Sequence, residues 1–338
     1  MTLGSLVWNR EARANTLPTD FMKDAADTSF VQRVCLPLLL KSQNQDGGWG
    51  FHPGSESRVE PTCWALLALS NSSSSQATQE FSAKAIRFLR SAQLPDGSWP
   101  ATPGERIGCW VTSLACWTLS LDKSANDATA AGLKWLCEDW PRDSSLWSRF
   151  LRKLLPGPSL APHNEAYRGW GWTVGTSSWV EPTSLALLAL KSAPAALLPV
   201  GAGRRRRLAE ALLYDRMCPG GGWNCGNPMI YGVAGEPLVI PTVWALLALR
   251  GNPQRSENAQ SLSWLQNELD KIQGPASLAL AQICLELYGR NRPENGQHLR
   301  DFYGKNEFLQ NIPVIAWVCL ALERTQGWPG NPAQGIPG

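Results

Sequence analysis

Two glutamates stand in the same local sequence, each directly before a proline and a threonine. Glu60 lies in "SRVEPTCWALLAL" and Glu181 lies in "SWVEPTSLALLAL". A third copy, "LVIPTVWALLAL", has Ile240 in place of the glutamate, so the turn itself does not require an acid. A carboxylic acid that is buried in an apolar site stays protonated near neutral pH and can act as a general acid. Glu60 and Glu181 are therefore candidate catalytic residues.

The chain has seventeen tryptophans, several of them inside apolar segments. Aromatic faces stabilise a carbocation by roughly 0.5–2 kcal/mol each, without trapping it as a nucleophile would. The candidates for lining a substrate cavity are Trp64, Trp110, Trp117, Trp244 and Trp317.

Both kinds of residue also have a purely structural interpretation. A glutamate at the start of a helix interacts favourably with the helix dipole, by about 0.3–1 kcal/mol, and needs no chemistry to explain it. A tryptophan in an apolar helix is a common core residue. His163, in a long loop, is either an ordinary loop residue or a base that removes a proton from a cation.

The elements that must position these residues recur along the chain. A Gly/Trp turn appears as "QDGGWGF", "PDGSWP", "RGWGW" and "PGGGWNCG", and each turn is followed by an apolar segment. Asp46 and Asp96 in the first two turns are expected to cap them. Amphipathic segments separate each apolar segment from the next turn, which indicates repeated helix pairs.

Six helix pairs can be assigned. The amphipathic outer helices are predicted at about residues 28–43, 79–93, 126–139, 204–217, 257–272 and 296–310. The apolar inner helices are predicted at about residues 61–70, 108–120, 182–191, 241–250, 275–288 and 313–323, and five of them have a proline in the first turn. Stacked pairs with a wholly apolar inner helix favour a closed ring. We expect an all-α fold, an (α/α)6 toroid in which six outer helices enclose a barrel of six inner ones.

The domain organisation follows from these elements. Residues 1–27 would form an N-terminal extension, residues 28–325 the toroid, and residues 326–338 a flexible C-terminal tail. The Pro- and Gly-rich stretch at about residues 141–180 would be an insertion in the toroid.

The turn and helix motifs carry a family likeness. "QNQDGGWGF…VEPTCWALLAL" and "CPGGGWNCG…IPTVWALLAL" resemble the Gln/Trp repeats of squalene-hopene cyclases and the related repeats of protein prenyltransferase β subunits. The likeness covers about residues 29–322 and implies a single toroid of that superfamily. For function it implies a terpene-cyclase-like enzyme, an isomerase or lyase that acts on an isoprenoid.

The acid motif of the cyclases is only partly present. In that family the proton donor is the central aspartate of Asp-x-Asp-Asp, directly before an inner helix that begins Thr-Ala. Aligned on the threonine, this position falls on Glu60 or Glu181, and neither flanking aspartate has a counterpart. A carboxyl group without acidifying partners protonates an epoxide more readily than a plain alkene. An epoxide is therefore the favoured substrate.

Two other functions stay open. A prenyltransferase β-like subunit would need a zinc site, and the family's Asp-x-Cys matches only Pro61-Thr62-Cys63, with proline in place of the aspartate. A toroid without catalytic activity could bind an isoprenoid or a peptide as a scaffold. An acid above an apolar pocket would favour the enzyme, and a centre filled by large side chains would favour the scaffold.

The composition limits partners and location. A formal net charge of +3 gives no reason to expect a nucleic-acid partner. Nine scattered cysteines and three histidines indicate reduced core thiols, and we expect no metal and no cofactor. With no signal-peptide pattern at the N-terminus, we expect a cytoplasmic protein. The sequence leaves open contact with a membrane surface and a second subunit.

Overall fold

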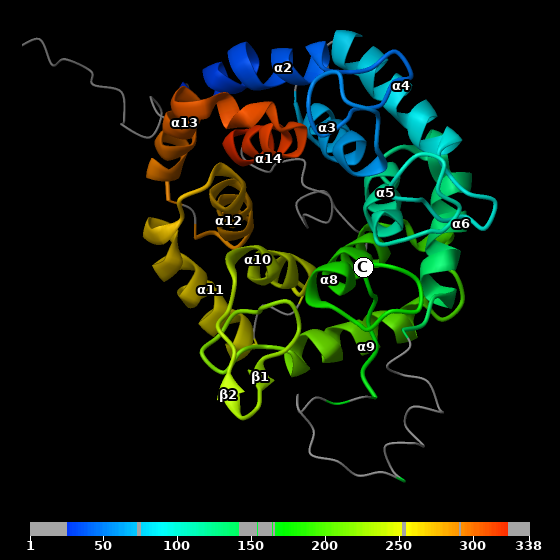
Figure 1. Ribbon diagram of the computed structural model, residues 1–338, viewed down its shortest axis with the longest axis vertical. Helices are drawn as coiled ribbons and strands as arrows, with labels where there is room; N and C mark the ends of the chain where they lie inside the picture. Colours follow the sequence, from blue (N-terminus) through cyan, green and yellow to red (C-terminus); the bar gives the residue numbers. More distant parts are fainter. Residues whose placement is uncertain are drawn as a thin grey trace, which may run out of the picture.

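The computed structural model describes residues 26–72, 76–141, 154, 164, 166–251, 255–290 and 292–323. Residues 142–153, 155–163 and 165 of the predicted insertion lie outside these ranges, as do most of the predicted N-terminal extension and the whole predicted tail. All twelve predicted helices are present, and the fold is an α/α toroid (Figure 1).

The six inner helices form a closed ring. They are α3 (Val59–Asn71), α5 (Val111–Leu119), α8 (Val180–Ser192), α10 (Val239–Ala248), α12 (Pro275–Leu287) and α14 (Ile312–Leu322). Each packs against the next in this order, and α14 packs against α3, which closes the ring (Figure 1). Inner helices are covered on both sides, so nearly every residue of α3 and α8 is buried.

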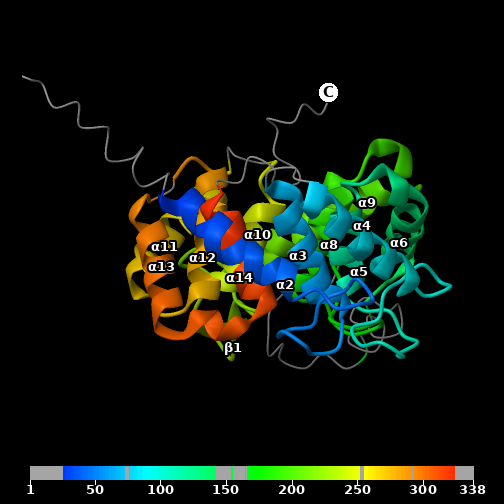
Figure 2. The ribbon, with the colours of Figure 1, turned by 90° about the horizontal axis from the view of Figure 1, so that it is seen from above.

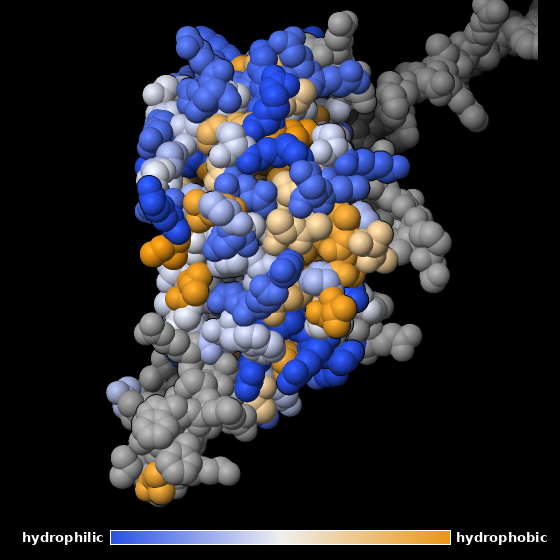
Figure 3. Space-filling view, turned by 90° about the vertical axis from the view of Figure 1, so that its right-hand side faces the viewer, coloured by the Kyte–Doolittle hydropathy of each residue, from blue (hydrophilic) through white to orange (hydrophobic). Residues whose placement is uncertain are grey.

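The outer helices surround this ring. Residues 26–30 are helical and continue through a π-helical stretch (Val31–Cys35) into α2 (Leu36–Lys41). The other outer helices are α4 (Gln76–Ser91), α6 (Asn126–Glu138), α9 (Ala202–Asp215), α11 (Ser256–Glu268) and α13 (Glu294–Asn306). Each is amphipathic and turns its apolar side toward the ring. The outer wall on the side of α4 and α6 is mostly hydrophilic, with apolar side chains in small groups (Figure 3).

Short elements complete the described chain. The 3-10 helices are η2 (Lys123–Ala125), η4 (Ala195–Leu197), η5 (Leu269–Lys271) and η6 (Glu307–Gln310). A hairpin that the sequence analysis did not predict joins β1 (Met229–Ile230) to β2 (Val233–Ala234). Tyr231 and Gly232 both have positive φ, 52° and 79°, as a two-residue hairpin turn requires.

The turn tryptophans fasten each outer helix to the inner helix that follows it. The Trp49 indole N–H donates to the Leu39 carbonyl at 2.7 Å, and its backbone N–H donates to the Thr62 hydroxyl at 2.9 Å. The same two bonds are made by Trp99, Trp170 and Trp223, whose hydroxyl partners are Thr112, Thr183 and Thr242. The Trp-to-Thr spacing of the repeat therefore fixes where each of these four inner helices begins.

Side chains of the turns also join neighbouring pairs. The Gln43 amide donates to the carbonyls of Gly47 in its own turn and Phe81 in α4, both at 2.9 Å. Gln93 makes the corresponding bonds one pair later. Asp46 accepts a hydrogen bond from the Gly48 N–H, and Asp96 does the same for Ser98, which confirms both as turn caps.

In the third turn, an arginine takes the place of the glutamine that joins neighbouring helix pairs. Arg205 of α9 is 2% exposed, and its guanidinium donates to the carbonyls of Asp139 and Gly169. It lies between the rings of Trp140, at 4.2 Å, and Trp170, at 3.9 Å. Burial lowers the pKa of Arg205 to about 10. This side chain connects the two ends of the predicted insertion.

The cysteines can be compared with the expectation of reduced core thiols. All nine cysteines are free; seven are buried, whereas Cys137 is half-buried and Cys225 is exposed. In the part of the chain that the structure describes, no helix has both the length and the apolar character needed to cross a membrane.

Candidate functional site

The repeated Trp-to-Thr hydrogen bonds place four residues at equivalent positions. Each lies two residues before the hydrogen-bonded threonine, at the N-terminal end of its inner helix: Glu60, Trp110, Glu181 and Ile240. We call these four residues the mouth ring, because the four N-termini lie at the same end of the toroid as the turn loops, on the side of β1 in Figure 2. Both predicted acids are therefore at one end of the barrel.

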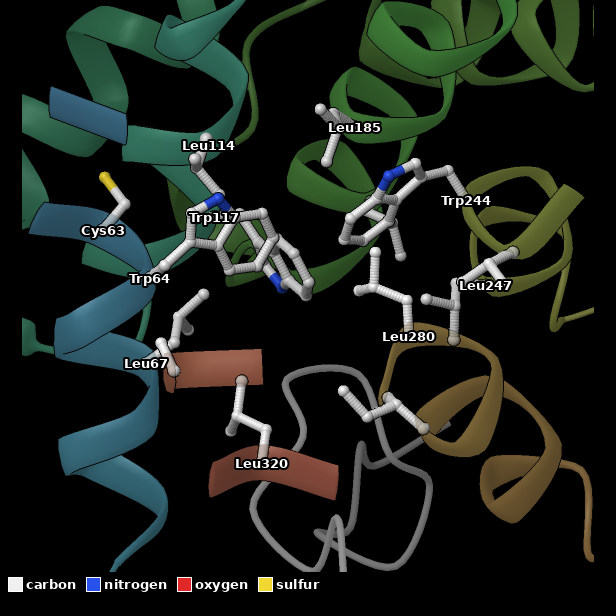
Figure 4. Close-up of a cluster of buried hydrophobic side chains, with 14 of the residues drawn as sticks. Cys63, Trp64, Leu67, Leu114, Trp117, Leu185, Trp244, Leu247, Leu280 and Leu320 are labelled. Atoms are coloured by element: carbon white, nitrogen blue, oxygen red, sulfur yellow. The ribbon is translucent and has the colours of Figure 1, made fainter. Parts of the chain in front are cut away.

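The helix period indicates which face of its inner helix each mouth-ring position belongs to. Residues four apart share one face of a helix. The residues one turn further along are Trp64, Leu114, Leu185 and Trp244, which extend toward a common centre in Figure 4. Glu60 and Glu181 thus stand one helical turn above the apolar side chains that fill the centre.

Four of the five predicted tryptophans meet in this centre. The Trp64 ring stacks on that of Trp244, with centroids 5.5 Å apart and planes at 28°. It also meets Trp117 at 6.1 Å and Trp317 at 5.4 Å, edge to face. We call these four residues the tryptophan cluster. The other three indoles all contact that of Trp64, so the four rings form a packed aromatic group at the centre of the ring.

Trp110 has a different environment. It is half-buried in the mouth ring and packs edge to face on Trp172, with centroids 5.3 Å apart. Its backbone N–H donates to the Trp172 carbonyl at 3.1 Å. Trp172 lies in a predicted turn and was not among the predicted site residues. The sequence feature that could have identified it is the second tryptophan of "RGWGW", because the other three turns have only one.

Glu60 is the more strongly perturbed of the two acids. The helix begins at Val59, so Glu60 lies inside its first turn and is half-buried. Burial raises its pKa to about 7, and the neighbouring Trp64 side chain partly offsets this effect. Its other neighbours include the buried thiols of Cys63 and Cys109, whose pKa values it helps to raise. A substantial fraction of Glu60 is therefore protonated at neutral pH.

Glu181 occupies the same position in α8. It is half-buried, and burial raises its pKa from the ordinary value. The adjacent Val180 N–H donates to the Cys225 carbonyl at 3.1 Å, and Glu181 in turn helps to raise the pKa of the exposed Cys225 thiol. Glu181 thus lies beside the end of the fourth turn, near solvent.

The remaining candidate features lie elsewhere. A pocket of about 550 Å³ opens at the opposite end of the toroid, between α4 and the C-terminal end of α3, and none of the predicted site residues lines it. Within the described ranges, no group of three or more His, Cys, Asp or Glu side chains is placed to hold a metal ion. His163 lies outside the described residues.

Comparison with known proteins identifies the fold. No protein-family model matches the chain. A solved structure of the type II terpene cyclase MstE from Scytonema, in complex with geranylgeranyl dihydroxybenzoate, matches 90% of this chain and 98% of its own with a TM-score of 0.59 at 13% identity. The chain has the α/α toroid fold of terpene cyclases. The toroid also matches cellobiose 2-epimerase from Spirochaeta thermophila, at 13% identity over 92% of this chain and 98% of that one with a TM-score of 0.60, so the fold does not specify one activity.

Sequence comparison also finds a relative of this chain. Drimenyl diphosphate synthase from Streptomyces showdoensis is 26% identical over 248 residues, which cover 62% of this chain and 45% of that protein. The toroid thus spans about half the length of this curated relative.

Proposed function

We propose that this toroid is a terpene-cyclase-like enzyme that protonates an isoprenoid polyene or epoxide at its mouth. Glu60 is the general acid, and the tryptophan cluster is the aromatic surface beneath the substrate. The observation that carries the proposal is the position of Glu60, one helical turn above Trp64, the residue that contacts all three other members of the cluster.

The electrostatics at Glu60 suit proton donation. A general acid works best when its pKa lies near the operating pH, and burial brings the pKa of Glu60 to about 7. Protonation of the substrate would create positive charge directly over the faces and edges of indole rings. Cation–π attraction stabilises that charge and adds no nucleophile.

The substrate class follows from the strength of the acid. No other carboxyl group among the described residues acts on the pKa of Glu60, so nothing there makes it a stronger acid. An epoxide oxygen accepts a proton more readily than an alkene carbon. The proposal therefore favours an isoprenoid epoxide over the plain polyene. Contact with a membrane surface and a second subunit stay predictions.

The test is turnover of an isoprenoid panel. Purified protein is incubated with squalene, oxidosqualene, geranylgeranyl diphosphate and farnesyl diphosphate, and the products are separated by gas chromatography with mass detection. Glu60→Gln should lower formation of a cyclic isomer about 10²–10⁴-fold. Glu56→Gln is the control, because Glu56 is exposed and lies just before the same helix. Equal activity of Glu60→Gln and wild type would remove Glu60 as the acid.

A second function, binding without catalysis, is favoured by one observation. Trp64, Trp117 and Trp244 are at most 4% exposed, and the ring of Trp64 contacts both of the others. A packed centre of this kind would suit a scaffold that binds a ligand at the mouth. If wild-type protein binds one of the four compounds and converts none, the scaffold replaces the enzyme.

A further inference from the structure

The mouth ring holds two carboxyl groups at the same height on different helices. Glu60 begins α3 and Glu181 begins α8, and α5 lies between these helices in the ring. Neighbouring helix axes lie roughly 8–10 Å apart, so axes two apart in a ring of six are separated by roughly 14–17 Å. Both side chains start from the helix face that carries Trp64 in α3 and Leu185 in α8, so the carboxyl groups approach the mouth from two directions. A substrate must span this separation to reach both.

We propose that Glu181 is the base that ends the reaction which Glu60 begins. This assignment rests on the proposed cyclase function and adds a second catalytic residue to it. The Glu60 O–H bond breaks as the epoxide oxygen takes the proton, a C–O bond of the epoxide breaks to leave a hydroxyl group and a cationic carbon, and this cation closes rings through the double bonds of the substrate. A C–H bond beside the last cationic carbon then breaks; its electron pair forms a new C=C bond, and the proton passes to the Glu181 carboxylate.

This cycle balances without a co-reactant. The substrate gains one proton and loses one, so the product is an isomer. At the end Glu60 is ionised and Glu181 is protonated, and both return to their starting states by exchanging protons with water. Glu181 lies beside the exposed Cys225, at the solvent side of the mouth, where such exchange is direct.

The direction of the cycle follows from what lies under each acid. Beneath Glu60 is Trp64, whose ring contacts three further indoles and can stabilise a new cation. Beneath Glu181 is Leu185, an aliphatic side chain that offers no such stabilisation (Figure 4). A cation is better formed over Trp64 and discharged over Leu185.

The two carboxyl groups also titrate separately. Neither contributes to the pKa of the other, so one can be protonated while the other is ionised. Burial raises both pKa values, that of Glu60 more strongly, so Glu181 is the more readily ionised of the two, as a base must be. In the described part of the chain, neither side chain forms an ion pair that would hold its charge state fixed.

The experiment follows the products of Glu181 variants. Wild type, Glu181→Gln and Glu181→Ile are compared on the four-compound panel in water labelled with ¹⁸O. The isoleucine variant guards against a folding defect of the glutamine variant, because Ile240 already occupies this position in α10. Glu236→Gln is the control, since Glu236 is exposed and belongs to the loop before α10.

The expected outcome is continued substrate consumption with altered termination. Without the base, water captures the cation, so the ratio of cyclic alkene to ¹⁸O-labelled alcohol should fall at least tenfold in both variants. Glu181→Asp should restore most of the alkene. An unchanged ratio would overturn the assignment, as would complete loss of consumption in folded Glu181 variants, which would make Glu181 the initiator. If wild type converts none of the compounds, the cyclase function itself fails and Glu181 loses its role with it.

Discussion

The carboxyl group of Glu60 stands one helical turn above the indole of Trp64, on the same face of α3. Trp64 is the member of the tryptophan cluster that touches the other three, so a single side chain links the acid to the whole aromatic group. Burial raises the pKa of Glu60 to about 7 in this position. The relationship leads to predictions for stability as well as for activity.

Glu60 should make the protein less stable as the pH rises. Its pKa of about 7 in the folded protein exceeds the ordinary value of 4.5, so between these values the folded state binds more protons than the unfolded state. The free energy of unfolding therefore falls by about 2–3 kcal/mol as the pH rises through this range. Glu60→Gln should lack this contribution.

The measurement is urea unfolding of wild type and Glu60→Gln at pH 4.5 and pH 8. Burial also raises the pKa values of Glu181, Asp139 and Glu323, so both proteins should lose some stability over this range. The prediction concerns the difference between them, which should shift in favour of the variant at pH 8. A difference that stays constant with pH would contradict the burial of this carboxyl group.

Cyclisation should depend on pH in the direction of an acid catalyst. Only the protonated form of Glu60 can donate, so the rate should be highest below its pKa and fall about tenfold per pH unit well above it. Initial rates between pH 5 and pH 9 would locate the midpoint near pH 7. A rate that rises through this range would show that the required group is a base.

Gly169 should be indispensable for the third turn. A Cβ at Gly169 would overlap the Thr183 hydroxyl, the group that accepts the Trp170 backbone N–H at 3.0 Å. Gly169→Ala should cost about 2–4 kcal/mol through overpacking and the loss of this bond. Gly304 lies in α13 with open space around it. Gly304→Ala should therefore stabilise the protein, by about 0.5–1 kcal/mol, because alanine favours the helix more than glycine does. Denaturation midpoints of the two variants test the pair.

Arg205 should not be replaceable by lysine. Its guanidinium stacks between Trp140 and Trp170 while donating to two carbonyls, which a single ammonium group cannot reproduce. Arg205→Lys should lower the free energy of unfolding by about 2 kcal/mol. Arg204→Lys, at an exposed neighbouring position, should change it by less than about 0.5 kcal/mol. Equal effects would show that the stacking and the two carbonyl bonds add no stability.

Much of the architecture was readable from the repeat. The Gly/Trp turns and apolar segments predicted twelve helices, and each is present with ends that differ by a few residues. The sequence did not indicate the hairpin at Tyr231 and Gly232, because two residues with positive φ were needed there and only one is a glycine. It also gave no indication that Arg205, one of four consecutive arginines, is a buried structural residue.

The candidate site, too, could be predicted only in part from the sequence. The sequence by itself determined that Glu60 and Glu181 share one position in the repeat, because the Pro-Thr after each of them is local information. Only the tertiary structure decided that four tryptophans from four different helices meet at the centre of the ring, one helical turn below the level of the acids. Helix periodicity fixes which residues share a face, but closure of the ring decides which faces meet. An apolar helix that is covered on both sides gives no sequence signal for the side that points to the axis.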